Sequence, residues 1–315
     1  MLCLVGQTPA RINMLHVVHH PDYVVAAAQT GSFTFDKYRL VMDALRDSGV
    51  AFTAHLPEPM PRGWIEAAHD PSYVAEVLAA AVPPEKERRI GFAVTPAVAR
   101  RAALTPGGTW LAAKLAVEHG FAANMAGGSH HALYDTGAGY CVFNDLAIVA
   151  RRWVAEDPSA HVLIVDLDVH QGDGTAILTA DCAAITTFSL HGEHNFPRQK
   201  ARSSHDVALP DGIGDDDYLA VLAEHLPAVI DRARPSLILY QAGVDPHRED
   251  KFGRLGLSDE GLIARDRSVM DAARERGLPL ASTLGGGYGA DPHRIARRHV
   301  ATTLALAAAN KVSTG

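Results

Sequence analysis

The stretch Val162-Leu-Ile-Val-Asp-Leu-Asp-Val-His170 begins as a continuous apolar run and ends in alternating polar side chains. Such a run is typical of a strand that is buried on both faces of a parallel sheet. Because side chains two residues apart on a strand point the same way, Asp166, Asp168 and His170 should emerge together at its carboxyl end. Open α/β sheets build their sites at this end, and two carboxylates with an imidazole suit a zinc-like divalent ion.

Four other segments have the same organisation, an apolar strand-like run that closes in glycine and a reactive side chain. They are Phe121–His131, Ala184–His191, Leu237–Asp245 and Leu278–Tyr288. Glycine allows the backbone to turn sharply or to approach a ligand closely. Any one of these ends could be a capped strand with incidental polar residues, but five of them together predict one convergent site.

Helical and strand-like patterns alternate along the rest of the chain. This alternation predicts an α/β fold, a single-domain, mainly parallel sheet flanked by helices on both faces. Helices are expected over Phe35–Ser48, Ser72–Ala81, Thr95–Thr105, Gly107–Gly120, Phe143–Glu156, Asp215–Ala233, Asp259–Arg276 and His293–Ala309. The longest irregular stretch is expected at Gln199–Asp217. Residues 1–13 are interpreted as a short N-terminal extension and residues 14–315 as one domain.

The composition is that of an ordinary soluble enzyme, with 47% hydrophobic residues among 315 and a formal net charge of −7. No basic stripe stands out, so direct binding to nucleic acid is not expected. No apolar run is long enough for a membrane span, and the first residues lack the pattern of a signal peptide. Three cysteines without paired spacing suit a reducing compartment, which predicts a cytoplasmic protein.

Seven ordered motifs resemble those of the arginase/histone deacetylase superfamily. Within it, they are most similar to the zinc-dependent histone deacetylase family, and in particular to its class IV-like bacterial deacetylases. The motifs are Gly127–Ala132, Gly139–Asp145, Asp166–Gly174, Ser189–His191, Asn195–Pro197, Tyr240–Asp245 and Leu284–Tyr288. The resemblance covers nearly the whole chain from about residue 14. It implies the arginase/deacetylase fold and a metal-dependent amidohydrolase that removes acyl groups, acetyl or longer, from lysine side chains.

The resemblance also implies a role for each matching residue at the reacting centre. Asp168, His170 and Asp245 would hold one Zn²⁺ and leave room for water and a substrate oxygen. The metal would polarise the amide carbonyl and make its water easier to deprotonate. The remaining catalytic residues would be His131 as general base and acid with Asp173 orienting it, His130 paired with Asp166, and Tyr288 as donor to the oxyanion.

Further positions match the family's substrate tunnel and a second ion. Gly139 would offer its carbonyl to the substrate amide, while Tyr140, Phe196 and Phe252 would form apolar walls that suit a neutral acylated lysine. A structural K⁺ would be bound by Asp166 and Ser189 with backbone carbonyls of Asp168, His170 and Leu190.

Two competing enzymes of the same superfamily differ in specific residues. A ureohydrolase would need a second metal and further carboxylates, but Gly172 and His247 stand at the positions where they are expected. An acetylpolyamine hydrolase tends to carry an acidic residue where Phe252 stands, which disfavours a small acylated amine without excluding it. A non-catalytic acyl-lysine binding module would be free to lose Tyr288 and the two histidines, yet all are present.

Overall fold

The computed structural model describes residues 14–25 and 34–310, so the predicted extension at residues 1–13 lies outside the described part. Eight strands form one sheet in the order β2-β1-β3-β8-β7-β4-β5-β6, and every pairing between these strands is parallel. The strands are β1 (Leu15–Val18), β2 (Phe52–His55), β3 (Phe121–Asn124), β4 (Val162–Asp166), β5 (Ile185–Gly192), β6 (His205–Leu209), β7 (Leu237–Gln241) and β8 (Leu280–Thr283). This sheet confirms the predicted fold class.

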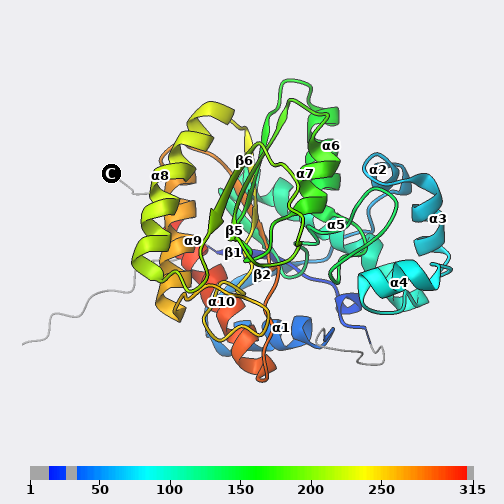
Figure 1. The fold of residues 1–315 in the computed structure, drawn as a ribbon, viewed down its shortest axis with the longest axis horizontal. Coiled ribbons are helices and arrows are strands. Elements are labelled where there is room, and N and C mark those ends of the chain that lie inside the picture. Colours follow the sequence, from blue (N-terminus) through cyan, green and yellow to red (C-terminus); the bar gives the residue numbers. More distant parts are fainter. Residues whose placement is uncertain (1–13, 26–33, 311–315) are drawn as a thin grey trace, which may run out of the picture.

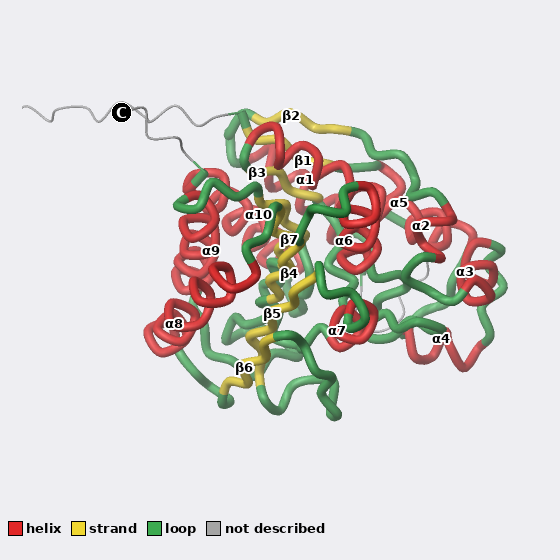
Figure 2. Tube along the Cα trace, turned by 90° about the horizontal axis from the view of Figure 1, so that it is seen from above, coloured by secondary structure: helices red, strands yellow, loops and turns green. Residues whose placement is uncertain are grey.

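Helices cover both faces of the sheet (Figure 2). One layer contains α1 (Lys37–Asp47), α8 (Asp215–Ala233), α9 (Asp259–Arg274) and α10 (Pro292–Ala309). The opposite layer contains α5 (Pro96–His119), α6 (Asp145–Glu156) and α7 (Asp173–Thr179). The short helices α2 (Arg62–Glu66), α3 (Pro71–Leu78) and α4 (Pro84–Ile90) lie to one side of α5 (Figure 1). No helix of the described residues is both long and apolar enough to span a bilayer.

Helix α8 has the bounds that its sequence predicts. Three aspartates occupy its first turn, where they complement the positive end of the helix dipole. Tyr218, Leu222 and Leu226 recur at a spacing of four residues and are all buried against the sheet layer. Here the local signals and the tertiary packing agree, and a pattern of this kind is readable from sequence alone.

Helix α5 corrects the prediction of two helices separated at Pro106. The structure has one continuous helix from Pro96 to His119, with Pro106 inside it. Proline costs a helix one backbone hydrogen bond, but tertiary packing can offset that cost. The backbone of α5 packs closely against the chain at Glu58. A Cβ at Gly107 would lie 1.9 Å from the Glu58 carbonyl oxygen, so only glycine allows this contact. Burial of α5 therefore stabilises the helix enough to offset the unfavourable proline at position 106.

Strand β6 corrects the second local prediction, because it lies within the stretch Gln199–Asp217 that was expected to be irregular. It is an edge strand that pairs only with β5, from Phe188↔His205 to Gly192↔Leu209. Four of its five residues are half-exposed or exposed, and the segment has no continuous apolar run that would mark a strand in the sequence. The ladder with β5, rather than side-chain hydrophobicity, defines this strand.

Candidate active site

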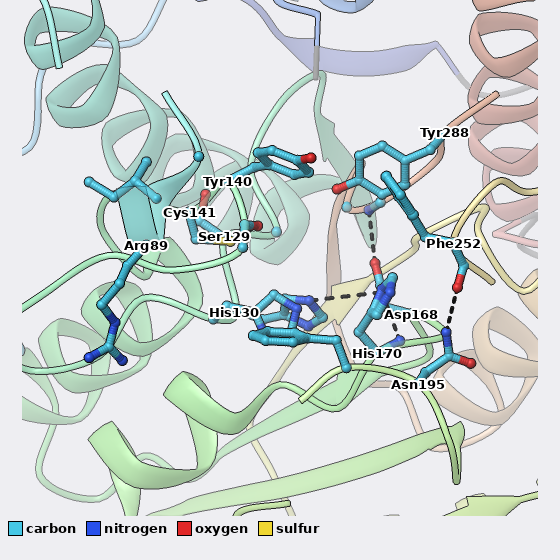
Figure 3. A pocket seen from close by; sticks show the side chains of 18 of the residues that line it. Arg89, Ser129, His130, Tyr140, Cys141, Asp168, His170, Asn195, Phe252 and Tyr288 are labelled. Carbon is cyan, nitrogen blue, oxygen red and sulfur yellow. Dashed lines mark hydrogen bonds and ion pairs between the residues drawn. The ribbon is translucent and has the colours of Figure 1, made fainter. Parts of the chain in front are cut away.

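Five neighbouring strands, β3, β8, β7, β4 and β5, end at one edge of the sheet, and the polar segments seen in the sequence follow them. A cavity of about 560 Å³ opens above these ends (Figure 3). Its lining residues include His130, His131, Gly139, Tyr140, Asp168, His170, Phe196, Phe252 and Tyr288. The predicted convergence of these side chains is therefore present in the structure.

Asp168, His170 and Asp245 form a buried group whose ligand atoms all lie within 4.8 Å of one another. The His170 Nδ1 lies 2.9 Å from Asp168 Oδ1 and 3.2 Å from Asp245 Oδ2. Among residues 14–25 and 34–310, neither carboxylate forms an ion pair with a lysine or arginine. Burial and the Asp168 carboxylate raise the pKa of Asp245 to about 7. Two buried carboxylates that no lysine or arginine neutralises fit a divalent cation.

The Asp168 carboxylate is held in place by donors from several strand ends. Gln241 donates its side-chain amide to Asp168 Oδ2 at 2.8 Å, and the Gly286 backbone N–H donates to the same oxygen at 2.8 Å. Close approach of Gly286 requires glycine, because a Cβ there would lie 2.0 Å from Asp245 Oδ2. The Val169 N–H donates to Asp245 Oδ1 at 2.9 Å. These contacts fix both carboxylates independently of any ion.

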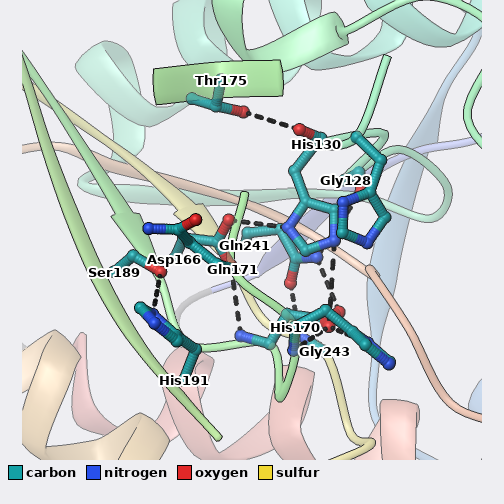
Figure 4. A network of polar contacts seen from close by, with 12 residues as sticks. Gly128, His130, Asp166, His170, Gln171, Thr175, Ser189, His191, Gln241 and Gly243 are labelled. Carbon is teal, nitrogen blue, oxygen red and sulfur yellow. Dashed lines mark hydrogen bonds and ion pairs between the residues drawn. The ribbon is translucent and has the colours of Figure 1, made fainter. Parts of the chain in front are cut away.

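The two adjacent histidines each contact a different carboxylate. His130 Nδ1 lies 2.7 Å from Asp166 Oδ2, and His131 Nδ1 lies 2.7 Å from Asp173 Oδ1 at the start of α7. The His130 backbone carbonyl accepts from the Thr175 backbone N–H at 3.0 Å. The Thr175 hydroxyl lies 3.5 Å from the same oxygen (Figure 4). Both pairings predicted from the resemblance are present, and both use Nδ1. The Nε2 atom of His130 lies 3.8 Å from Asp168 Oδ1.

Burial and neighbouring charge shift the pKa values of these histidines in opposite directions. Burial alone would lower the pKa of His130, but Asp166 and Asp168 outweigh it and raise the pKa to about 9. Burial lowers the pKa of His131 to about 4, and the positive charge of His130 contributes in the same direction. The lowered pKa of His131 favours the neutral form that accepts a proton, whereas the carboxylates beside His130 favour its protonated form.

Aromatic rings and a glycine surround the entrance to this centre. Phe196 packs edge-to-face on His131 with ring centroids 4.8 Å apart. Gly139 and Tyr140 both have positive φ, at 53° and 67°. A Cβ at Gly139 would lie 2.7 Å from the His131 ring, so this backbone can pass close to the imidazole only as glycine. The loop is thereby fixed beside the reacting centre.

Tyr288 lies between two of the aromatic walls. Its ring centroid is 5.8 Å from that of Tyr140 and 5.0 Å from that of Phe252, and its hydroxyl points into the cavity (Figure 3). Asp250 accepts from the backbone N–H groups of Tyr288 at 2.6 Å and Phe252 at 2.8 Å. One half-buried carboxylate thus positions both residues. Burial, reinforced by the Asp245 and Asp168 carboxylates, raises the pKa of Tyr288, which keeps its hydroxyl protonated.

The residues predicted for K⁺ also lie together. Asp166 and Ser189 are register partners on β4 and β5, and Figure 4 places both beside His191. The Ser189 hydroxyl lies 2.9 Å from His191 Nδ1. The site itself stays a prediction.

The two positions that separate this chain from a ureohydrolase carry no carboxylate. Gly172 lies directly against the Asp166 carboxylate, since a Cβ there would be 2.3 Å from Oδ2. His247 is buried, and its Nε2 lies 3.4 Å from Asp259 Oδ1. The only group of three or more metal-binding side chains among the described residues is Asp168, His170 and Asp245.

Several residues of the site carried no predicted role. Gln241, Asp250 and Asn195 hold the functional loops, and Asn195 donates to the Phe252 carbonyl at 2.7 Å. Gln241 stands within a predicted motif, so its position was readable although its contact was not. Arg88 and Arg89 line the cavity from α4, far from any motif, and no local sequence signal marks them.

Residues 31–304 match the family model for the histone deacetylase domain. The chain belongs to the histone deacetylase family. It is 42% identical to an uncharacterized protein of Picosynechococcus, over 90% of this chain and 95% of that protein. It is 35% identical to Histone deacetylase 2 of Arabidopsis thaliana, but spans only about half (48%) of that protein's length, over 58% of this chain. The predicted family is therefore confirmed, and the chain is a hydrolase of the deacetylase class.

Two solved structures share the fold. The acetylpolyamine aminohydrolase from Burkholderia pseudomallei has a TM-score of 0.76 at 19% identity, covering 93% of this chain and 98% of its own. The HDA15 HD domain has a TM-score of 0.75 at 20% identity, covering 92% of this chain and 89% of its own. At these identities the likeness establishes the deacetylase fold alone.

Proposed function

We propose that this deacetylase is a zinc-dependent amidohydrolase that removes acyl groups, acetyl or longer, from lysine side chains of proteins or peptides. The observation that carries this proposal is the buried group of Asp168, His170 and Asp245 at the base of an aromatic-walled cavity. One nitrogen and two oxygen ligands suit Zn²⁺ and leave coordination positions open. When bound, the metal would polarise the acyl carbonyl and lower the pKa of a bound water.

The protein's own groups then divide the remaining chemistry. His131, neutral and hydrogen-bonded through Nδ1 to Asp173, accepts the proton of the attacking water at Nε2 and returns it to the lysine nitrogen. His130, held by Asp166, lies beside the centre, and the carboxylates around it favour its protonated form. Tyr288, whose hydroxyl stays protonated, donates a hydrogen bond to the oxygen that becomes negative.

The shape and chemistry of the entrance favour an acylated lysine as the substrate. Tyr140, Phe196 and Phe252 present aromatic faces to a side chain that must enter in an extended form. An acyl-lysine is neutral, and its methylene stem gains by leaving water for such walls. Its amide N–H can donate to the Gly139 carbonyl. The same proposal includes a structural monovalent cation, which Asp166 and Ser189 would hold close to His130.

Turnover of a substrate panel tests the proposal. The panel contains one peptide with lysine acylated from acetyl to myristoyl, together with N-acetylspermidine, and is run on zinc-loaded enzyme. We expect hydrolysis of at least one acyl-lysine peptide with higher kcat/KM than that of the polyamine, and inhibition by a hydroxamate that chelates the metal. Faster hydrolysis of the polyamine than of every peptide would replace the lysine substrate by a small acylated amine.

A further inference from the structure

The cavity carries a charge opposite to that of the molecule as a whole. The chain has a formal net charge of −7, yet four arginines line the cavity and the only carboxylate among its lining residues is Asp168, a proposed metal ligand. Arg88, Arg89 and Arg254 are exposed at the entrance, whereas Arg101 is buried deeper inside. Uneven charge of this kind acts on whatever approaches the cavity.

Arg88 and Arg89 stand directly beside the wall that receives the substrate. They form the last turn of α4, and the backbone N–H of Gly139 donates to the Arg89 carbonyl at 3.1 Å. The next residue along, Ile90, accepts from the Tyr140 N–H at 2.7 Å. These two bonds fasten the end of α4 to the Gly139–Tyr140 loop. Figure 3 shows Arg89 on the side of the cavity opposite Phe252.

Neither of these two arginines is neutralised by a neighbour. In the part of the chain that the structure describes, no carboxylate lies within ion-pair distance of Arg88 or Arg89. Across the entrance, Arg254 and His194 share a single carboxylate, Asp211, at 3.3 Å each. Arg88 and Arg89 therefore stand at the entrance without a paired carboxylate, while Arg254 shares one with His194.

We propose that the cluster of Arg88, Arg89 and Arg254 selects acyl-lysines that stand in an acidic sequence context. This inference rests on the proposed lysine deacylase function and names its substrate class. Residues that flank an acyl-lysine inserted into the cavity must pass the entrance, within reach of these guanidinium groups. Aspartate or glutamate there would be attracted, and lysine or arginine repelled. A lysine-rich tail or a polyamine is the least favoured ligand of such an entrance.

The size of the effect follows from where the charges stand. Exposed charges act mainly on the rate of encounter, and steering by a charged entrance changes that rate by about 10- to 1000-fold. Salt screens them over about 10 Å at an ionic strength of about 0.1 M. We therefore expect an acidic peptide to exceed a basic one in kcat/KM by about tenfold at low salt, and by much less at high salt.

The experiment uses three acetyl-lysine peptides of equal length whose flanking residues are acidic, neutral or basic. Each is hydrolysed by the zinc-loaded full chain at low and at high ionic strength. The double substitution Arg88→Glu with Arg89→Glu reverses the charge beside the Gly139–Tyr140 loop and should reduce the acidic-to-basic ratio about tenfold. Arg88→Gln with Arg89→Gln removes the charge without reversing it and should give an intermediate ratio. Circular dichroism and thermal melting verify that each variant is folded.

A matched control places the same charge change elsewhere. Arg232 in α8 and Arg267 in α9 are exposed, have no ion pair among the described residues and do not line the cavity. Arg232→Glu with Arg267→Glu should leave the acidic-to-basic ratio as in the wild type. Equal kcat/KM for all three peptides, a preference for the basic one, or a ratio unmoved by the Arg88 and Arg89 substitutions would overturn this inference alone. Absence of turnover of all three peptides would overturn it together with the lysine deacylase function.

Discussion

The base and the entrance of the cavity are built in different ways. At the base, Asp168 is 1% exposed, and its carboxylate accepts from Gln241 and Gly286, which belong to two different strand ends. At the entrance, Phe196 is 48% and Phe252 37% exposed, so solvent borders the walls that meet the substrate. The base is fixed by many mutual contacts, whereas the entrance can change residue by residue. Chemistry should therefore be sensitive to substitution at the base, and selectivity to substitution at the entrance.

The largest expected effect is at the metal-binding group. Asp168→Ala removes one of two carboxylates and should abolish both metal retention and turnover, because a cation there loses an anionic ligand. Metal content by elemental analysis and acyl-lysine hydrolysis measure the two losses on the same preparation. A folded Asp168→Ala protein that keeps its metal and its activity would contradict the claim that the chemistry depends on the base of the cavity.

The next effect separates the catalytic hydroxyl from its aromatic neighbour. Tyr288→Phe keeps the ring but loses the hydroxyl, and should lower kcat by at least about a hundredfold, the magnitude seen for an oxyanion donor. Tyr140→Phe is the matched substitution on the facing wall and should cost far less. Steady-state kinetics on the zinc-loaded proteins compare the two. Equal losses would show that Tyr288 acts as a wall and not as a donor.

His131→Ala tests the proton-transfer role proposed for His131. It should lower turnover by at least about a hundredfold, since a positioned general base contributes about 100- to 10,000-fold. The loss should appear in kcat more than in KM, because His131 transfers protons in the chemical step rather than holding the substrate. A variant with near-wild-type kcat would assign the proton transfer to another group.

The sequence predicted the polar base of the cavity and its aromatic walls, but not the arginines at its entrance. Strand ends with Asp, His and Gly at fixed spacing carry a strong signal, and α8 follows its pattern to the residue. Two local predictions were wrong where tertiary contacts decide. Pro106 lies inside a helix because that helix is buried, and β6 exists through its ladder with β5. Arg88 and Arg89 reach the cavity only through the docking of α4, which no periodicity reveals.

At the entrance, a substitution of Phe252 should change selectivity without removing the chemistry. Phe252→Glu offers a counter-charge to a second ammonium group, so the kcat/KM ratio of acetylspermidine to acetyl-lysine peptide should rise. An exposed ion pair is worth up to about 1 kcal/mol, so a rise of a few-fold is expected. Competition between the two substrates in one reaction measures the ratio directly. If kcat/KM fell by the same factor for both substrates, Phe252 would support the chemical step and would not determine selectivity.

The last effect concerns stability rather than activity, at a histidine next to the loop that carries His130 and His131. His69 is buried and contacts the Leu133 carbonyl at 2.8 Å through Nδ1, and its Nε2 accepts from the Asn144 N–H at 2.9 Å. Burial lowers its pKa to about 4 from the ordinary 6.5. Between pH 6.5 and about 4 the unfolded chain binds this proton and the folded one does not. The stability from His69 is therefore complete above pH 6.5 and is lost as the pH falls towards 4.

Urea unfolding at a series of pH values measures this loss. One buried neutral histidine lowers the free energy of unfolding by about 1.4 kcal/mol per pH unit in that window. His69→Gln keeps a polar side chain that does not titrate. The slope of the unfolding free energy against pH should therefore fall by the amount that corresponds to one proton. An unchanged slope would mean that His69 is protonated in the folded protein as well.

Titration of the metal-free protein with Zn²⁺, followed by hydrolysis of an acyl-lysine peptide, tests the central claim most directly. The claim is that one ion, held by Asp168, His170 and Asp245, makes this cavity a deacylase. Activity should be absent without metal, rise linearly with added zinc and stop rising at one equivalent per chain. Activity that needs no metal, or that rises to two equivalents bound at these residues, would contradict the account.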